Sequence, residues 1–230
     1  MSNIVIGIEG LVGAGKTSIC RELINIMPNT VLLNGGNLYR AIVYAMIKNG
    51  DKLEDLKKKG NNLDIKEMMD YFNIKIKIEN KETMIYIDNE KADEEVLQSK
   101  KASLAVSTIG GTADNKKLFE FAKDLINNLK NKYNVIVSGR SVMKIYPDCD
   151  YHFFIIADLD ERVKRKQKQY NNKDSYDDIK EMIIKRDELQ EKAGFYEYSK
   201  ITQEIDVTKC LSVKESTNLV LEKIKILDLV

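Results

Sequence analysis

A glycine-rich motif near the N-terminus constrains the fold of this chain more than any other stretch. Residues 10–17 read GLVGAGKT and match G-x-x-x-x-G-K-[ST], the phosphate-binding loop (P-loop) of many nucleotide-binding proteins. The apolar residues 3–8 before it predict a short buried strand, and residues 17–24 after it predict a helix with one apolar face. Glycines let backbone N–H groups turn toward phosphate oxygens, and a helix N-terminus adds partial positive charge. The sequence therefore predicts a strand, a loop and a helix that bind nucleotide phosphates.

The chemistry of the motif assigns a role to each of its polar residues. We expect Lys16 to bridge the outer phosphates and the Thr17 hydroxyl to bind Mg²⁺. The expected nucleotide-binding residues are Gly10, Gly13, Gly15, Lys16, Thr17 and Ser18.

Composition narrows the class of protein. The chain has 230 residues, 43% hydrophobic and 32% charged, as in a globular protein of one sizeable domain. A formal net charge of +1 gives no reason to expect a nucleic-acid or membrane partner. Three widely spaced cysteines fit neither a disulfide framework nor a zinc site and indicate a reducing compartment. With no long apolar run and no signal peptide pattern, we expect a cytoplasmic protein.

Further short apolar runs indicate a parallel sheet. They lie at residues 30–33, 134–138, 151–156 and 204–207, and helical patterns separate them. Together with the first strand they predict a five-stranded parallel sheet covered on both faces, a three-layer αβα fold. Residues 34–37 predict a turn before a helix over 38–48. Residues 74–78 and 84–87 alternate apolar and polar side chains and predict a β-hairpin within an insertion. Other helices are predicted over 64–71, 93–106, 113–132, 159–170, 175–192 and 212–227.

The positions of the arginines suggest a second anion site. In open parallel α/β sheets, ligands bind beyond the C-terminal ends of the strands. Arg40 and Arg140 follow two of the predicted strands, so we expect them to meet a second phosphate. Arg162, Arg165 and Arg186 flank a polar loop and could close over a transferring phosphoryl group, since arginine binds phosphate bidentately. A surface ion pair is the alternative for each arginine taken alone.

Two other features favour structural roles. His152, the only histidine, lies among aromatic and aliphatic residues and is expected in the core or at a strand edge. The basic run at residues 164–168 is more typical of a solvated helix face than of a nucleic-acid patch, although the nearby arginines strengthen a phosphate interpretation.

In their order and spacing, these features resemble the bacterial-type cytidylate kinases of the nucleoside monophosphate kinase superfamily. Residues 33–40 read LNGGNLYR where that family has L-D-[TS]-G-A-M-Y-R. The other matching stretches are the P-loop, the hairpin, Ala102-Ser103, Gly139-Arg140, and residues 146–148, 157–162, 186–187 and 205–208. The resemblance implies transfer of the γ-phosphoryl group of ATP to CMP or dCMP with Mg²⁺, by a monomer. It also implies a core of residues 1–39 and 113–230, a monophosphate-binding insertion at 40–112 and a lid at 160–186.

The resemblance implies roles for the site residues. Arg40 and Arg140 would hold the acceptor phosphate, Tyr39 would lie near the base and Ser103 would read the cytosine. The implied substrate-binding set is Gly36, Tyr39, Arg40, Ser103, Arg140 and Ser141. The implied catalytic set is Lys16, Arg140, Arg162, Arg165 and Arg186, acting by positioning and charge neutralisation.

Departures from the family pattern concentrate on the acceptor side. The family has acids at three positions that are neutral here, namely Ser138, Ser141 and Gln190. Its Asp before the Tyr-Arg motif is Asn34, and the following Ser or Thr is Gly35. Its second arginine is replaced by Ala193. Losing two charged hydrogen bonds costs roughly 3–6 kcal/mol if nothing compensates. Two alternatives therefore stay open: a kinase of the same fold for another nucleotide or nucleoside, and a nucleotide-binding protein without catalysis.

Overall fold

The computed structural model describes residues 2–50, 64–93, 97, 116–196 and 198–224. Its centre is the predicted parallel sheet, formed by β1 (Val5–Gly10), β2 (Thr30–Asn34), β6 (Asn134–Ser138), β7 (Tyr151–Ile156) and β8 (Thr202–Asp206). These strands lie in the order β2-β6-β1-β7-β8, and every neighbouring pair is parallel. All six residues of β1 are buried, which explains why residues 5–8 carry no polar side chain; Glu9 is buried as well. The predicted α/β fold is confirmed.

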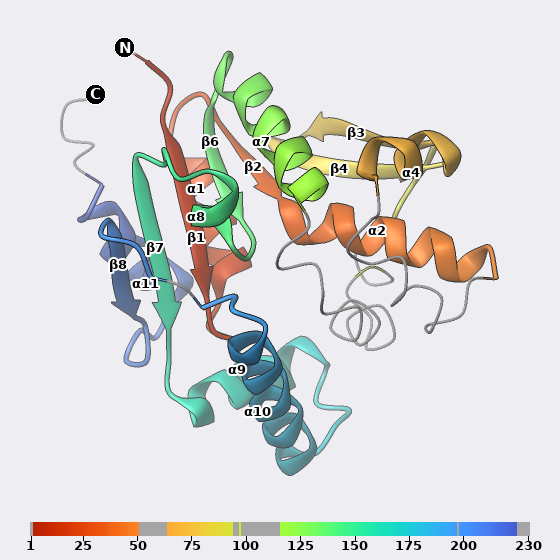
Figure 1. Cartoon of the computed structure of the whole chain (residues 1–230). Coiled ribbons are helices and arrows are strands. Elements are labelled where there is room, and N and C mark those ends of the chain that lie inside the picture. The colour runs from red at the N-terminus through yellow and green to blue at the C-terminus, as the bar shows by residue number, and fades with distance from the viewer. Residues whose placement is uncertain (1, 51–63, 94–96, 98–115, 197, 225–230) are drawn as a thin grey trace.

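Helices cover both faces of this sheet (Figure 1). On one face, α1 (Lys16–Ile26) and α11 (Val213–Leu221) pack against Ile6 and Ile8 of β1. On the other, α7 (Lys116–Lys130) and α8 (Val142–Ile145) pack against Val5. Successive residues of β1 thus point into opposite cores, as the two-residue period of a strand requires.

The predicted hairpin is present and extends the central sheet. β3 (Ile74–Glu79) pairs antiparallel with β4 (Glu82–Ile87) through a tight turn, and β4 pairs parallel with β2 at Leu32 and Glu82. A short strand, β5 (Glu90–Lys91), pairs with β4. The hairpin, α2 (Gly35–Lys48) and α4 (Ile65–Tyr71) share a separate core that includes Ile42 and Ile85. The division into core, insertion and lid stays a prediction.

The turn predicted at residues 34–37 is wrong. Helix α2 begins at Gly35, directly after the strand, and Asn34 takes the N-cap position. Glycine and asparagine suggested a turn, but the entropic cost of a glycine in a helix is only about 1 kcal/mol. Burial of the apolar face of α2, which includes Leu38 and Ile42, outweighs it. The helix predicted over 93–106 lies almost entirely outside the described residues, as do the ends of those predicted over 113–132 and 212–227.

Two further helices lie beyond the C-terminal ends of β1 and β7 (Figure 1). They are α9 (Leu159–Gln169) and α10 (Tyr176–Lys192), and the Ser175 side chain caps α10 by accepting from the Asp178 N–H. Val163 of α9 and Ile179 and Ile183 of α10 form a small core with Val12 of the glycine-rich loop. This contact places both helices against the predicted nucleotide site.

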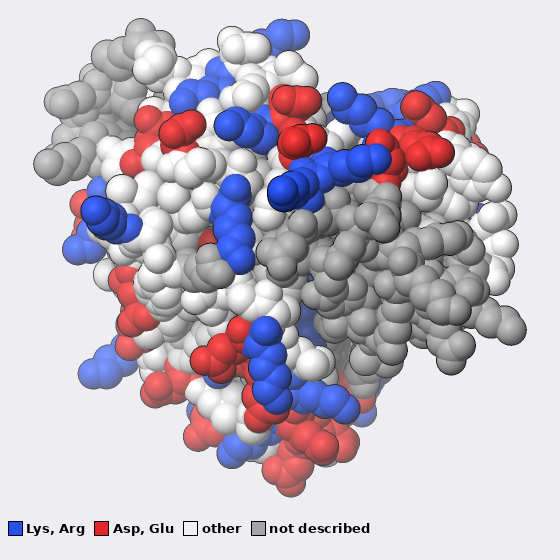
Figure 2. Space-filling view, in the orientation of Figure 1, with Lys and Arg blue, Asp and Glu red and all other residues white. Residues whose placement is uncertain are grey.

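Charges of both signs are interspersed on the face of the molecule shown in Figure 2. This mixture agrees with the formal net charge of +1. Among the described helices, none is long and apolar enough to cross a membrane.

Candidate functional site

The glycine-rich loop follows β1 and is shaped by close contact with neighbouring chain segments. Gly10 has φ 143°, and a Cβ atom there would lie 2.1 Å from the carbonyl oxygen of Ile155. Gly13 has φ 82°, and a Cβ atom there would lie 3.1–3.3 Å from atoms of Arg162 and Lys166 on α9. Glycine is therefore required at both positions, for the backbone conformation and for space.

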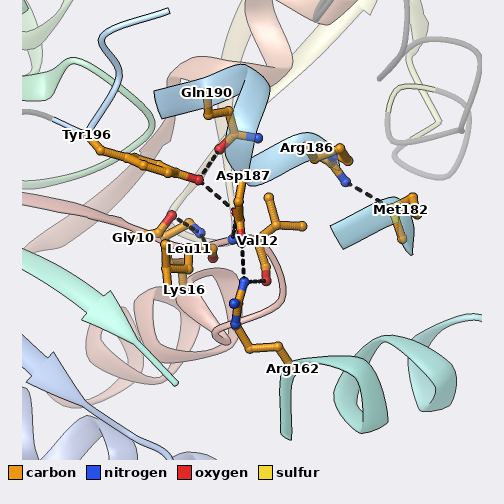
Figure 3. A network of polar contacts seen from close by, with 10 residues as sticks. All are labelled: Gly10, Leu11, Val12, Lys16, Arg162, Met182, Arg186, Asp187, Gln190 and Tyr196. Carbon is orange, nitrogen blue, oxygen red and sulfur yellow. Dashed lines mark hydrogen bonds and ion pairs between the residues drawn. The ribbon is translucent and has the colours of Figure 1, made fainter. Parts of the chain in front are cut away.

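Lys16 opens helix α1 directly behind this loop. Its Nζ donates to the carbonyl oxygens of Gly10 (2.8 Å) and Leu11 (2.7 Å), which turns the ammonium inward across the loop (Figure 3). Burial, followed by repulsion from neighbouring cations, lowers the pKa of Lys16 to about 7. As in any helix, the N–H groups of Lys16, Thr17 and Ser18 have no carbonyl one turn earlier, so they are suited to bind an anion.

Val12 of the loop is clamped by side chains from both α9 and α10. Its N–H donates to Oδ1 of Asp187 (3.1 Å), and its carbonyl oxygen accepts from Nη1 of Arg162 (3.2 Å). Arg162 and Asp187 also form an ion pair with each other, as Figure 3 shows. Their side chains are only 9% and 18% exposed, so the pair is poorly screened by water. These contacts fix the backbone of the loop between α9 and α10, two helices that lie about 150 residues or more after the loop in the sequence.

Arg165 holds the same loop one turn further along α9. Its Nη1 donates to the carbonyl oxygen of Ala14 (3.1 Å) and its Nη2 to that of Val207 (2.9 Å). Its Nε donates to Oε1 of Glu161 (3.0 Å). All three nitrogens of this guanidinium are thus engaged with the protein. The structure brings Arg162 and Arg165 to the loop, and their predicted contact with the γ-phosphate stays a prediction.

The other predicted arginines converge on the space between the loop and β6. Arg140 follows β6, and its guanidinium carbon lies 5.8 Å from the centroid of the Phe195 ring. Burial and repulsion from Arg186 and Arg40 lower the pKa of Arg140 to about 10. Arg186, on α10, points toward Met182 (Figure 3). Its buried Nε has no hydrogen-bond partner among the described residues. A buried, partnerless donor in a cluster of like charges favours a bound anion.

Residues predicted on the acceptor side are only partly brought together. Gly36 lies in the first turn of α2, where a Cβ atom would be 3.1 Å from Nη1 of Arg40, so its small size leaves room for that guanidinium. Tyr39 is 6% exposed and packs in the core shared by α2 and the hairpin. Ser103 lies outside the described residues. The predicted contacts of Tyr39 and Ser103 with a base stay predictions.

Ser141 has an unusual backbone and an unusual side-chain environment. It takes the left-handed conformation (φ 55°, ψ 30°) at the N-terminus of α8 and is 6% exposed. Its buried Oγ has no hydrogen-bond partner within the described part of the chain. Strained backbone and an unsatisfied hydroxyl cluster at binding sites, which supports the predicted substrate contact.

Sequence reasoning missed two residues of this network. Asp187 enters the sequence analysis only as part of the match at residues 186–187, and Tyr196 is not singled out there. The Tyr196 hydroxyl lies 2.9 Å from Oδ1 of Asp187 and 2.7 Å from Oε1 of Gln190. Burial and the Asp187 carboxylate raise the pKa of Tyr196, so the hydroxyl keeps its proton. The Arg-Asp pair at 186–187 was the available signal.

The only histidine lies beneath the site, as predicted, in the core. His152 is fully buried, with Nε2 2.7 Å from Oε2 of Glu9 and Nδ1 2.9 Å from Oγ1 of Thr202. Oε1 of Glu9 accepts the N–H of Val142 (3.2 Å). This network joins the strand before the loop to the start of α8.

Comparison with known proteins decides the family. A family model described as cytidylate kinase matches residues 6–226. The chain belongs to the cytidylate kinase family. A cytidylate kinase of Clostridioides difficile (strain 630) is 29% identical over 98% of this chain and 100% of its own length. A cytidylate kinase of Halalkalibacterium halodurans is 24% identical over 98% of this chain and 99% of its own length. The predicted family is thus confirmed.

Within this family, the neutral residues at 138 and 190 acquire a structural explanation. Ser138 is 7% exposed and lies close to the Cys20 thiol, whose pKa burial raises to about 12. Gln190 is 3% exposed, and its Nε2 lacks a hydrogen-bond partner among the described residues. A carboxylate at either position would be buried, which is costly without a cation or metal beside it. The substitutions make this wall of the site less negative.

Proposed function

We propose that this protein transfers the γ-phosphoryl group of ATP to a nucleoside monophosphate, with CMP or dCMP as the favoured acceptor and ADP and CDP or dCDP as products. Family membership and the shaped P-loop support the donor. The cytoplasm as location, and action as a monomer without a nucleic-acid or membrane partner, belong to the same proposal.

One observation carries the proposal: cations from four segments gather around the loop. Lys16, Arg140 and Lys166 each have a pKa lowered by burial and then by neighbouring cations, and Arg186 acts on all three. Asp187 raises the pKa of Lys16 and Arg140, but it is already paired with Arg162. Gathering these charges is unfavourable unless anions bind there. Two phosphate groups, one from each nucleotide, would supply that charge.

The residues present fit ATP with Mg²⁺. The first turn of α1 offers N–H groups without helical partners to the phosphates, and Thr17 places a hydroxyl in the same turn. In the described ranges, no cluster of three or more His, Cys, Asp or Glu side chains could hold a metal ion. Mg²⁺ binds through few protein ligands together with substrate phosphates and water, and the Thr17 hydroxyl would be one of those ligands. When bound, it neutralises charge on the phosphate oxygens.

The protein's own residues contribute by binding and orientation, with no covalent intermediate. Lys16 and the first N–H groups of α1 would hold the donor phosphates, and Arg40 and Arg140 would hold the acceptor phosphate opposite them. The clamp on Val12 keeps the loop in one conformation as the phosphates bind. Such positioning and preorganised charge account for most of the catalysis of phosphoryl transfer.

A second candidate is a kinase of this fold for a different small acceptor. The neutral residues Ser141 and Gln190 favour this candidate, because they stand where the family has acids. An acceptor site with fewer carboxylates suits a ligand that has fewer hydroxyl donors or more negative charge than CMP. The donor site is the same in both candidates.

The test is an ADP-release assay with ATP, Mg²⁺ and a panel of CMP, dCMP, UMP, AMP, GMP and nucleosides. We expect turnover of CMP or dCMP well above that of the others, and none for Lys16→Ala. Preference for another acceptor would establish the second candidate. ATP binding without turnover of any acceptor would refute both and leave a nucleotide-binding protein that has lost catalysis.

A further inference from the structure

Helix α9 presents one face to the glycine-rich loop. Residues three, four and seven apart share a face of an α-helix, and on α9 these are Arg162, Arg165, Lys166 and Gln169. Arg162 donates through Nη1 to the Val12 carbonyl oxygen and to Asp187, and Arg165 donates through Nε, Nη1 and Nη2 to Glu161, Ala14 and Val207. Both guanidinium groups thus hold the loop in shape, and Lys166 is the remaining cation on this face of α9.

Lys166 lies directly over the loop. Its Cγ would be 3.3 Å from a Cβ atom at Gly13, so its aliphatic stem packs on the backbone of the motif. The neighbouring basic residues Lys164 and Lys168 on the same helix are exposed instead. One lysine of the basic run is thereby distinguished from the other two by its position.

The ammonium group of Lys166 lies within electrostatic reach of both halves of the site. Burial, followed by repulsion from Arg186 on α10 and Arg40 on α2, lowers the pKa of Lys166 to about 8. Lys166 in turn lowers the pKa of Lys16. The charge of Lys166 is therefore close enough to interact with cations predicted to hold the donor and the acceptor.

Lys166 also retains donors for a ligand. Its Nζ donates to Oε1 of Gln169 (2.7 Å) and lies 5.3 Å from the centroid of the Tyr170 ring. An ammonium group has three N–H donors, and the described residues supply one hydrogen-bond acceptor for them. The four-carbon stem allows the head to turn from Gln169 toward a phosphate without moving the helix.

We propose that Lys166 is the catalytic residue that α9 supplies to the transferring phosphoryl group, and that Arg162 and Arg165 are positioning residues that hold the loop. This proposal rests on the proposed function. In the transfer, the bond from the γ-phosphorus to the oxygen shared with the β-phosphate breaks, and its electron pair stays on ADP. An oxygen of the acceptor phosphate forms the new bond to phosphorus. Lys166 forms no bond and keeps its protons, and its charge stabilises the equatorial oxygens.

The test compares Lys166→Met, Lys166→Arg and a matched control, Lys164→Met, which removes the same charge from the exposed face of the same helix. We expect Lys166→Met to lower kcat by about 100-fold or more, as the loss of one preorganised charge does at other sites, with ADP affinity within about threefold of wild type. Lys166→Arg should recover at least about tenfold of that loss, because a guanidinium restores the positive charge. Lys164→Met should match wild type.

A binding measurement separates failure of this proposal from failure of the proposed function. Beryllium fluoride bound beside ADP imitates the γ-phosphoryl group and should increase the affinity of the protein for ADP. This increase can be measured without any acceptor nucleotide. Lys166→Met should lose most of that strengthening, whereas Lys164→Met should keep it. If Lys166→Met keeps both the strengthening and kcat, the proposal is wrong although the kinase function stands. If wild type turns over no acceptor while Lys166→Met loses the strengthening, the proposed function is wrong and Lys166 remains the phosphoryl contact.

Discussion

Raising the pH from 7.5 to 9.5 tests the environment of Lys16 directly. The pKa of its ammonium is lowered to about 7 by burial and by three neighbouring cations. A bound triphosphate brings negative charge beside it, which raises the pKa of Lys16 in the complex above this pH range. Because the charged lysine binds phosphate far better than the neutral amine, nucleotide affinity should fall as the free protein loses this proton.

The size of the fall follows from proton linkage. For one group with a pKa of about 7, the apparent Kd is multiplied by a factor of about 4 at pH 7.5 and about 320 at pH 9.5. Affinity should therefore fall about 80-fold, equivalent to about 2.6 kcal/mol. The phosphates of ATP are fully ionised throughout this range, so the ligand itself contributes little.

The stability of the ligand-free protein should change in the opposite direction. Because the folded pKa of Lys16 lies below that of the unfolded chain, the unfolded state binds more protons between about pH 7 and pH 10. The contribution of Lys16 to the free energy of unfolding therefore rises with pH, by up to about 1.4 kcal/mol per unit. A Lys16→Met variant should lack this rise.

Isothermal titration calorimetry with ADP at constant ionic strength, paired with urea unfolding at the same pH values, measures both trends. Lys16→Arg is the matched control, since a guanidinium stays charged throughout the range and should leave ADP affinity nearly independent of pH. A wild-type affinity that changes by less than about threefold between pH 7.5 and 9.5 would refute the reasoning.

Two further substitutions test the loop and its clamp. Gly10→Ala places a Cβ atom 2.1 Å from the Ile155 carbonyl oxygen, so the free energy of unfolding should fall by about 2–6 kcal/mol in urea titrations and ADP binding should be lost. The control is Gly50→Ala, which is also at positive φ but has no atom within 4 Å of the new Cβ. It should lower the free energy of unfolding only by the cost of backbone strain. Equal losses of stability at the two sites would contradict the steric argument. Asp187→Asn leaves Arg162 buried without its counter-charge and should lower stability by about 3 kcal/mol, with weaker ADP binding by calorimetry; unchanged stability would mean that the clamp contributes little.

The fold was predictable from the sequence where one physical signal dominates. Strands buried on both faces appear as apolar runs, and a complete phosphate-loop motif fixes the strand, turn and helix around it. The start of α2 was mispredicted because Gly35 and Gly36 suit both a turn and a first helical turn. The hairpin attaches to the central sheet through the pairing of Leu32 with Glu82 and the bonds of Thr83 to β2, which no local pattern reveals.

The site was predictable by residue type but not by contact. Sequence position suggested that Arg162 and Arg165 lie near phosphate, and both do lie against the loop. Whether the N–H groups of these arginines face a ligand or a carbonyl oxygen depends on how α9 packs against the loop. The pattern of apolar residues in the sequence does not predict that packing. Lys166 differs from Lys164 only once the buried side of α9 is known.

The clamp on Val12 has a consequence for the order in which the protein matures. The backbone of the phosphate loop is complete in the first 17 residues, but the groups that hold it come from Arg162 and Asp187, 150 and 175 positions later. Such long-range contacts form late, because a long segment of chain must first be ordered. A ribosome-bound chain that ends before α10 therefore carries the whole motif without its support. Nucleotide affinity of the nascent chain should appear only when the last third of the protein has been synthesised, so capture of nucleotide reports completion of the fold.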